Sequence, residues 1–510
     1  MVLAKVLSST LLGVDAHRVE VEVDLASGLP MFTTVGLPDA SVRESRDRVK
    51  AAMANCGFPF PLRRITVNLA PAHLRKAGTA FDLPIALGLL RASGYIQSGM
   101  LSRYQVVGEL SLDGRVKAVA GVLPMAVGAL ESGAEGMVVP LENAAEAAVV
   151  EDVPVFGVET LAQAIGFFNG TESLSRTVCD VNALFEKKAV YAEDLADVKG
   201  QQHVKRALEV AAAGAHNMLL IGPPGSGKSL MARRLPSILP DMELAEAIET
   251  SKIHSIAGLL HRDQALVATR PFRAPHHSTS DAGLIGGGTI PGPGEVSLAH
   301  NGVLFLDELP EFRRSVLEVL RQPLEDAQVT IARASVALTF PARFMLAAAM
   351  NPCPCGYSTD PQRACHCSAQ QLQRYTGRIS GPLLDRIDIH IEVPPVHYAD
   401  LASSAATEPS AAVRARVNAA RQRQRARFAG TAIPHNAAMG VRDIRQYCRL
   451  DAGGERLLEQ AMHRFGLSAR AHDRIRKVAR TIADLAGADA IGIEHLSEAV
   501  QYRTLDRQSG

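Results

Sequence analysis

The sequence lacks a long apolar run, and its charges nearly cancel. No stretch reaches the roughly 18 uninterrupted apolar residues that a membrane-spanning helix requires, so we expect no membrane partner. The 54 basic residues oppose 53 acidic ones, which gives a formal net charge of +1. The overall charge therefore favours neither a nucleic acid nor a membrane surface as a partner, and any such signal must be local.

Cysteine and aromatic residues are also scarce. Aromatic residues make up 5% of the chain, and four of only seven cysteines lie between Cys353 and Cys367. So few cysteines in a chain of 510 residues argue against a disulfide framework and favour a reducing compartment. The N-terminus carries Lys5 within its first apolar run and lacks a small-residue cleavage site. We therefore expect no export signal and a cytoplasmic location.

The apolar content suffices for several folded cores. Hydrophobic residues make up 47% of the chain and charged residues 21%, which excludes a mostly disordered protein. At about 150 residues per domain, the length predicts about three domains. We expect a multidomain α/β protein.

Sequence patterns place the domain boundaries. In residues 1–170, short strands such as Arg64–Leu69 alternate with helical stretches, which predicts an α/β domain. The polar residues 171–190 predict a linker. Residues 191–395 contain continuous apolar strands of the kind that a parallel sheet buries on both faces. Residues 396–510 are rich in Ala, Arg and Leu and predict a helical domain.

A phosphate-binding loop follows one of these apolar strands. Its residues satisfy the pattern G-x-x-x-x-G-K-[ST]: Gly222, Pro223, Pro224, Gly225, Ser226, Gly227, Lys228 and Ser229. Such a loop turns backbone N–H groups toward phosphate oxygens, and the helix that follows directs its positive end at the same charge. Lys228 would supply a point charge to ATP, and Ser229 would bind Mg²⁺.

Two further strands end in polar side chains suited to the same chemistry. Asp307 and Glu308 lie at the end of the apolar strand that begins at Val303. Asp307 would hold Mg²⁺ through water, and Glu308 would polarise the attacking water as general base. Asn351 ends the next apolar strand and could orient that water. Alternatively, the two carboxylates could mark a solvated strand end, and Asn351 could be an ordinary turn residue.

Taken together, the phosphate loop, the Asp-Glu strand and the strand-terminal Asn resemble an AAA+ ATPase. The motifs at 270–277, 286–288, 293–295 and 297–300 resemble the magnesium-chelatase-like branch, and the whole chain to 502–507 resembles the ComM/YifB family. That resemblance implies a hexameric ATPase that drives branch migration of DNA junctions during natural transformation. Its DNA partner would be branched or single-stranded. Recombination proteins would then be its partners.

The same resemblance implies roles for further residues. The segment Asp197–Gln201 matches the adenine-side entry to the ATPase module. Arg386 would act as an arginine finger on the ATP of a neighbouring subunit, the alternative being a surface ion pair. Arg470 fits the second sensor in the helical lid, and Arg474 competes for that role.

Two elements are candidates for DNA contact. Arg333 lies near the tip of a predicted hairpin that would project into the pore of a ring. A tract without acidic residues contains six arginines: Arg414, Arg416, Arg421, Arg423, Arg425 and Arg427. Alternatively, Arg333 could be an ordinary hairpin arginine, and the tract could be a solvated helix face. Neither element has interleaved aromatic residues, so we expect contact with phosphates and no base stacking.

The crowded cysteines form the pattern C-x-C-x9-C-x-C. Cys353, Cys355, Cys365 and Cys367 could close a structural Zn²⁺ site, or they could be free or redox-active thiols. The adjacent His276 and His277 have no spaced partner, and we interpret them as hydrogen-bonding loop residues.

The N-terminal region resembles the proteolytic domain of Lon, which has a ribosomal protein S5 domain 2-like fold. The stretches 108–116 and 76–80 carry this resemblance. The serine position of the Lon dyad holds Ala80 and the lysine position holds Leu123. Neither side chain supplies the hydroxyl or the amine that a peptidase dyad needs.

Three functions compete at this point. An ATP-driven DNA motor accounts for the Lon-like region and the arginine tract. A magnesium-chelatase ATPase, which would act on a partner protein that holds a porphyrin, usually lacks the Lon-like region. An ATP-dependent protease is disfavoured by Ala80 and Leu123.

Overall fold

The computed structural model describes residues 3–188, 191, 193–260, 265–288, 291–333, 336–360, 363–396 and 407–503. Its contacts divide the chain into two compact units. The first comprises Met1–Lys187, Leu244–Ala268 and Ala332–Phe340, and the second comprises Lys188–Glu243, Thr269–Ile331 and Pro341–Gly510. The boundaries predicted from composition stay predictions. The second unit contains the predicted helical domain and most of the predicted ATPase core, whose residues 244–268 and 332–340 belong to the first unit.

The first unit is built on a mixed sheet of seven strands in the order β3-β4-β2-β1-β5-β8-β9. Strand β2 pairs antiparallel with β1 and β4, whereas the remaining neighbours pair parallel. The strands are β1 (Ala4–Leu12), β2 (Asp15–Ala26), β3 (Met31–Val35), β4 (Arg64–Ala70), β5 (Tyr104–Val106), β8 (Gly136–Pro140) and β9 (Val155–Val158), with a separate hairpin of β6 (Glu109–Leu110) and β7 (Val116–Lys117).

Helices cover both faces of this sheet. The helices of this part of the chain are α1 (Ala40–Asn55), α2 (Asp82–Ala92), α3 (Val122–Glu131), α4 (Leu141–Ala147), α5 (Leu161–Asn169), α6 (Val181–Lys188) and α9 (Leu244–Ile256). Gly88 of α2 lies against Val6. On α3, the Met125 carbonyl accepts from Gln105, which also donates to Ser9 Oγ. Because side chains alternate along β1, Val6 and Ser9 face opposite ways, so α2 and α3 lie on opposite faces.

The second unit contains the predicted parallel sheet. Its five strands run in the order β11-β14-β17-β10-β18, and every neighbouring pair is parallel. They are β10 (Met218–Ile221), β11 (Phe272–Arg273), β14 (Val303–Leu306), β17 (Met345–Met350) and β18 (Ile389–Glu392). All residues of β14 and β17 are buried, which explains their unbroken apolar sequence.

Short helices and two hairpins surround this sheet. The helices are α7 (Gln202–Gly214), α8 (Lys228–Ile238), α10 (Asp281–Ile285), α11 (Glu295–Leu298), α12 (Arg314–Glu318), α13 (Arg321–Asp326), α14 (Ala369–Thr376) and α15 (Gly381–Leu384). The hairpins are β12 (Gly286–Gly287) with β13 (Gly292–Pro293), and β15 (Gln328–Arg333) with β16 (Val336–Pro341), along which the division between the units runs.

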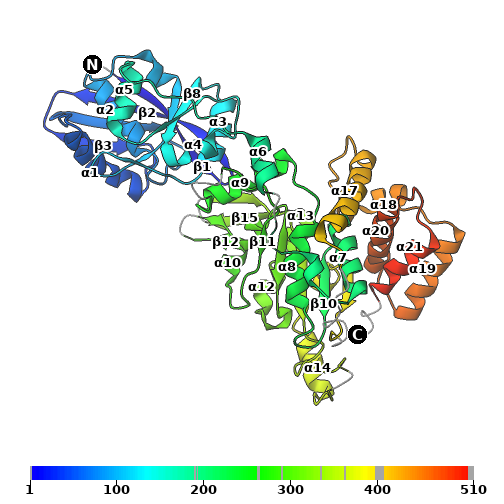
Figure 1. The fold of residues 1–510 in the computed structure, drawn as a ribbon. Helices are drawn as coiled ribbons and strands as arrows, with labels where there is room; N and C mark the ends of the chain where they lie inside the picture. Colours follow the sequence, from blue (N-terminus) through cyan, green and yellow to red (C-terminus); the bar gives the residue numbers. More distant parts are fainter. Residues whose placement is uncertain are drawn as a thin grey trace. The chain divides into compact units, whose positions relative to one another are not determined.

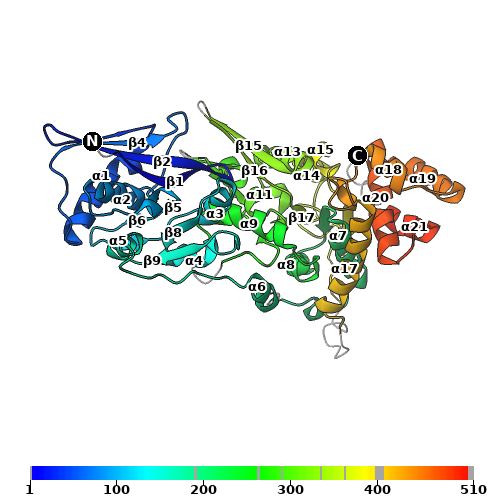
Figure 2. The same cartoon turned by 90° about the horizontal axis from the view of Figure 1, so that it is seen from above.

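The C-terminal part of the second unit is helical, as predicted. Helices α17 (Ser410–Arg427), α18 (Val441–Tyr447), α19 (Ala452–Phe465), α20 (Ala469–Leu485) and α21 (Ile493–Gln501) gather together in both ribbon views, in orange and red (Figures 1 and 2). Helix α20 buries Ile475, Val478 and Ile482 in the core of this unit. Across the described residues, no helix combines the length and the apolar character needed to cross a bilayer.

Candidate functional site

The phosphate loop, the Asp-Glu motif and Asn351 meet at one edge of the parallel sheet. In the strand register, Ile221 pairs with Met350 and Leu306 pairs with Ala348, so β10, β14 and β17 end at nearly the same level. Polar residues directly after parallel strands lie at the carboxyl edge of the sheet, where α/β proteins bind ligands. The structure thus brings together the residues that the sequence placed on three separate strands.

The phosphate loop leads directly into helix α8. Gly227 has φ of 90°, in the left-handed region that favours glycine, and α8 begins at Lys228. The Lys228 ammonium is buried and donates to the carbonyl oxygens of Gly222 at 2.7 Å and Pro223 at 2.9 Å, and to Asn351 Oδ1 at 3.2 Å. Burial lowers its pKa from the ordinary value, and a bound phosphate would offset that cost by supplying negative charge.

A second contact joins the loop to the Asp-Glu strand. Ser229 Oγ donates to Asp307 Oδ2 at 2.5 Å. The hydroxyl and the carboxylate are oxygen groups of the kind that hold Mg²⁺, and they lie side by side. This pair therefore fits a magnesium site beside the phosphates.

Glu308 has a neighbour that the sequence did not reveal. Its backbone is left-handed, with φ of 52°, and its side chain is exposed. His277 Nδ1 lies 3.5 Å from Glu308 Oε2, whereas His276 Nδ1 lies 2.8 Å from Ser278 Oγ, which is the loop contact we predicted for both histidines. His277 had no partner spaced along the sequence because its partner comes from the end of another strand.

Gln201 fastens the entry segment to the phosphate loop. Its Nε2 donates to the Ser226 carbonyl at 3.0 Å and to the Pro394 carbonyl at 2.6 Å. One side chain thus ties the loop to the residues that follow β18. The sequence had assigned this segment to the nucleotide only through a resemblance.

Arg386 and Arg474 line a common cavity of about 630 Å³. The Arg386 guanidinium forms an ion pair with Glu325 and donates to the Pro382 carbonyl at 2.5 Å. Arg474 forms an ion pair with Asp388. Within the described residues, the Nε atoms of both arginines have no hydrogen-bond partner.

Asp388 stands between Arg474 and a buried histidine. Its carboxylate lies 3.2 Å from His216 Nδ1. Burial acts to raise the pKa of Asp388, but the charge of Arg474 and the contact with His216 outweigh it and hold the pKa below its usual range. Arg470, by contrast, is not among the residues that line the cavity, and its exposed side chain lies 3.3 Å from Asp385.

Comparison with known proteins places this geometry in a family. Profiles described as magnesium chelatase, subunit ChlI, match residues 194–401 and 21–143, and its C-terminal profile matches residues 407–503. The chain is 47% identical to competence protein ComM of Haemophilus influenzae, over 99% of this chain and 98% of that protein. It belongs to the ComM/YifB family of magnesium-chelatase-like AAA+ ATPases.

Other relatives differ in how much of the chain they match. YifB of Escherichia coli is 44% identical over 97% of this chain and 96% of its own length. The magnesium-chelatase 38 kDa subunit of Cereibacter sphaeroides is 24% identical over 30% of this chain and 51% of its own length. The similarity to ComM/YifB proteins therefore includes the N-terminal unit, whereas that to the chelatase subunit covers less than a third of the chain.

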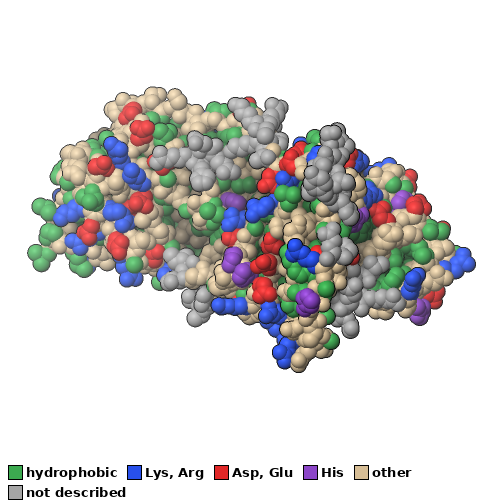
Figure 3. All heavy atoms as spheres, turned by 60° about the horizontal axis from the view of Figure 1, so that its bottom comes forward, with side chains coloured by type: hydrophobic (Ala, Val, Ile, Leu, Met, Phe, Trp, Pro, Cys, Tyr) green, Lys and Arg blue, Asp and Glu red, His purple; other side chains and the backbone are tan. Residues whose placement is uncertain are grey.

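All six arginines of the predicted tract lie on α17 and have partners within the second unit. Arg421 is buried and donates to the Ala212 carbonyl, and Arg427 forms an ion pair with the fully buried carboxylate of Asp484. The other four pair with carboxylates: Arg414 with Asp241, Arg416 with Glu209 and Glu408, Arg423 with Asp489, and Arg425 with Glu243. On the face drawn in Figure 3, basic and acidic side chains are intermixed, in keeping with the small net charge.

Some predicted elements lie partly outside the described residues. Arg333 is the last residue of β15, and the turn that follows it, with the Arg333 side chain, is not described. The same holds for residues 504–507 of the C-terminal motif. Their roles stay predictions.

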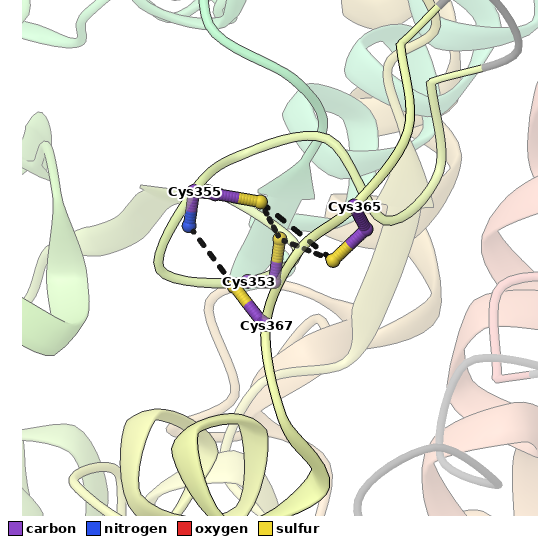
Figure 4. Close-up of side chains that lie close together, drawn as sticks. All are labelled: Cys353, Cys355, Cys365 and Cys367. Carbon is purple, nitrogen blue, oxygen red and sulfur yellow. Dashed lines mark hydrogen bonds between the residues drawn. The ribbon is translucent and has the colours of Figure 1, made fainter.

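The four cysteines form a single cluster (Figure 4). Their sulfur atoms all lie within 4.8 Å of one another: Cys353, Cys355, Cys365 and Cys367. No disulfide joins them. The backbone N–H of Tyr357 lowers the pKa of the Cys355 thiol to about 6, whereas burial and the neighbouring thiols raise the pKa values of Cys365 and Cys367.

The Lon-like positions in the first unit are closed. Ala80 and Leu123 are both buried. The backbone N–H of Leu123 donates to Glu146 Oε1 at 3.0 Å, and the Ser255 hydroxyl of α9 donates to the same oxygen. Helix α9 follows α8 in sequence but belongs to the first unit. Its Ser255 thus shares a hydrogen-bond acceptor with Leu123, the predicted lysine position.

Proposed function

We propose that this chain is an ATP-driven DNA motor that assembles as a hexameric ring and promotes branch migration during recombination of incoming DNA. Similarity along nearly the whole chain to a protein named competence protein ComM supports this proposal. The family membership gives the ATPase, and the DNA substrate and the ring are the steps beyond it. We expect it to act in the cytoplasm with recombination proteins.

The observation that carries the ATPase chemistry is the meeting of three strand ends. In the proposed reaction, a phosphate of ATP takes the place of the Gly222 and Pro223 carbonyls as the acceptor for the Lys228 ammonium. Ser229 and Asp307 would hold Mg²⁺, which would neutralise developing charge on the phosphates when bound. Glu308 accepts the proton of the attacking water.

Asn351 and His277 would position the reacting groups. The Asn351 amide, 3.2 Å from Lys228 Nζ, is close enough to the phosphate position to orient water. His277, 3.5 Å from Glu308, can hold that carboxylate aside or release it toward the water. These contacts motivate roles for both residues in controlling hydrolysis.

The cavity that contains Arg386 and Arg474 supports action across a subunit boundary. Within the described structure, the Nε donor of each guanidinium group has no hydrogen-bond partner. The described residues that line the cavity include none from the phosphate loop. In a ring, the γ-phosphate of a neighbouring subunit would compete with Glu325 for Arg386. Arg474, which shares this cavity, is the better candidate for the second sensor than the exposed Arg470.

For DNA, the exposed arginines of α17 are the better candidates. The side chains of Arg423 and Arg425 are 42% and 43% exposed and pair with exposed carboxylates. Arg421 is buried, and Arg416 and Arg427 pair with the buried carboxylates of Glu209 and Asp484. Ion pairs at the surface are weak, so phosphates can displace the carboxylates. Arg333 remains the candidate for the pore.

A decisive experiment compares ATP hydrolysis and strand movement with and without a branched DNA junction. We expect the junction to stimulate ATP hydrolysis. Its branch point should migrate only when ATP and Mg²⁺ are present. The magnesium-chelatase alternative is supported by the family profiles and by the shorter match to a magnesium-chelatase subunit. Hydrolysis that branched, duplex and single-stranded DNA all leave unchanged would contradict the motor and favour that alternative.

A further inference from the structure

The cysteine cluster has the dimensions of a four-sulfur metal site. Sγ–Sγ distances are 3.3 Å between Cys353 and Cys355, 3.6 Å between Cys355 and Cys365, and 3.8 Å between Cys353 and Cys365. Four sulfurs at about 2.3 Å from a tetrahedral Zn²⁺ ion are separated by about 3.8 Å. The observed separations are close to this value and far longer than the roughly 2.05 Å of a disulfide.

Backbone geometry preorganises the cluster. The Gly356 N–H donates to the Cys353 carbonyl at 3.0 Å, which closes a turn around Cys355. The Cys355 N–H points at Cys367 Sγ, 3.4 Å away, from the other end of the segment. Such N–H to sulfur contacts stabilise thiolates around a bound metal ion. The two C-x-C pairs therefore converge through the fold of the loop.

The same turn lies directly against the phosphate loop. Gly356 has φ of 88°, and a Cβ atom at this position would lie 2.5 Å from Pro224 Cδ and 2.7 Å from Pro224 Cγ. Only a glycine lets the two loops approach this closely. The cysteine turn therefore packs directly against Pro224.

The cluster also lies between Asn351 and helix α14 along the chain. Cys353, which is completely buried, follows Asn351 by two residues. After Cys367 the chain enters α14, where the buried Tyr375 contacts the backbone of Asn351. Asn351 is thus fixed between the turn and α14, with its amide on Lys228.

We propose that Cys353, Cys355, Cys365 and Cys367 bind one structural Zn²⁺ ion, and that this ion braces the phosphate loop and Asn351 for nucleotide binding. The brace rests on the proposed ATPase function, but the metal site does not. Without the ion, four adjacent thiols would separate, and the turn would no longer hold Pro224 and Asn351 in place. The ion takes no part in the chemistry of hydrolysis.

Metal content tests the first half of the proposal. The full-length protein, expressed with zinc and washed free of loose metal, should contain about one zinc per chain by plasma mass spectrometry. The double variant Cys365→Ser/Cys367→Ser should lose it. As a matched control, Cys56→Ser/Cys179→Ser changes two cysteines outside the cluster and should keep it. Iron in place of zinc, an absence of metal in the wild type, or zinc retained by the cluster variant would overturn the site.

Nucleotide affinity tests the brace separately. Gly356→Ala leaves all four thiols in place, so it should keep its zinc, yet the added methyl group pushes against Pro224. We expect at least a tenfold weaker affinity for a fluorescent ATP analogue, and a similar loss in the double cysteine variant. Gly430→Ala is the control, because its φ of 78° imposes the same backbone strain with no heavy atom within 4 Å of the added Cβ.

The outcomes separate the two proposals. If Gly356→Ala and the zinc-free variant bind the analogue as tightly as the wild type, the brace is wrong while the ATPase assignment stands. If the wild type itself binds no nucleotide, the ATPase proposal fails, whereas its zinc content still decides the metal site. Circular dichroism spectra that match the wild type establish that each variant is folded.

Discussion

The two units of this protein contain one open site and one closed site. In the second unit, Lys228, Asp307 and Asn351 meet at the edge of a parallel sheet, and their contacts are ones that a nucleotide and Mg²⁺ could replace. In the first unit, the two positions that would carry a peptidase dyad are Ala80 and Leu123, both buried.

The difference lies in how the polar groups are satisfied. Glu146 of the first unit accepts hydrogen bonds from Leu123 N–H, the Asn143 amide and the Ser255 hydroxyl. A buried carboxylate with three donors is part of the packing and has no remaining demand for a ligand. The Lys228 ammonium instead donates to neutral carbonyl and amide oxygens, and the charge of Asp307 offsets only part of the cost of its burial. The protein's own donors thus fill the site in the first unit, whereas the contacts in the second unit are ones that a nucleotide could replace.

The largest effect should come from removing the charge of the open site. Lys228→Ala should abolish measurable ATP binding, because no other ammonium lies in the phosphate loop. Glu308→Gln should keep ATP binding and lower the hydrolysis rate by about 10² to 10⁴-fold, since only the proton acceptor is lost. Equilibrium binding of a fluorescent ATP analogue and single-turnover hydrolysis check both. Wild-type affinity in Lys228→Ala would remove the basis for calling this site open.

The next effect asks whether the open site is complete within one chain. Arg386→Ala should lower kcat by about 10³-fold or more, because an arginine finger stabilises charge in the transition state. Mixing Arg386→Ala with Lys228→Ala subunits should restore part of the activity, since some interfaces pair an intact loop with an intact arginine. The measurement is steady-state hydrolysis over a range of mixing ratios. Mixed rings without any recovery would show that Arg386 acts within its own chain.

A moderate effect should follow from trying to reopen the closed site. Ala80→Ser with Leu123→Lys should yield no casein or peptide cleavage, and burying the new amine should lower the free energy of unfolding by about 3 kcal/mol or more. Leu130→Lys on the same helix is the control, because Leu130 is 42% exposed and should tolerate a lysine. Thermal denaturation and a peptidase assay check this. Peptide cleavage by the wild type would contradict the closed site outright.

The smallest effect concerns DNA. Arg423→Gln/Arg425→Gln should reduce the slope of log affinity against log salt by about 1.8, because each lost phosphate contact removes about 0.9. Arg427→Gln should leave that slope unchanged and instead destabilise the helical part, since Arg427 pairs with the buried Asp484. Fluorescence anisotropy with a junction over a salt series distinguishes them. Identical slopes in the double variant and the wild type would identify α17 as a purely structural helix.

Sequence alone located the chemistry wherever a role depends on neighbours along the chain. The phosphate loop, the strand-terminal Asp307 and Glu308 and the paired cysteines are local patterns, because backbone N–H groups, strand ends and C-x-C spacing set their geometry within a few residues. The parallel sheet was also predictable, since burial on both faces demands continuous apolar strands. The prediction that the first unit lacks a peptidase dyad rests on the identities of Ala80 and Leu123, and it stays a prediction.

Only the tertiary structure decided which distant groups meet. It placed His277 beside Glu308, gave each arginine of α17 a partner within the protein, and packed α9 into the first unit. It also set Gly356 against Pro224, which connects the cysteines to the nucleotide site. These pairings depend on how strands and helices pack after the chain has folded, and residue spacing carries no record of partners that lie tens or hundreds of residues apart.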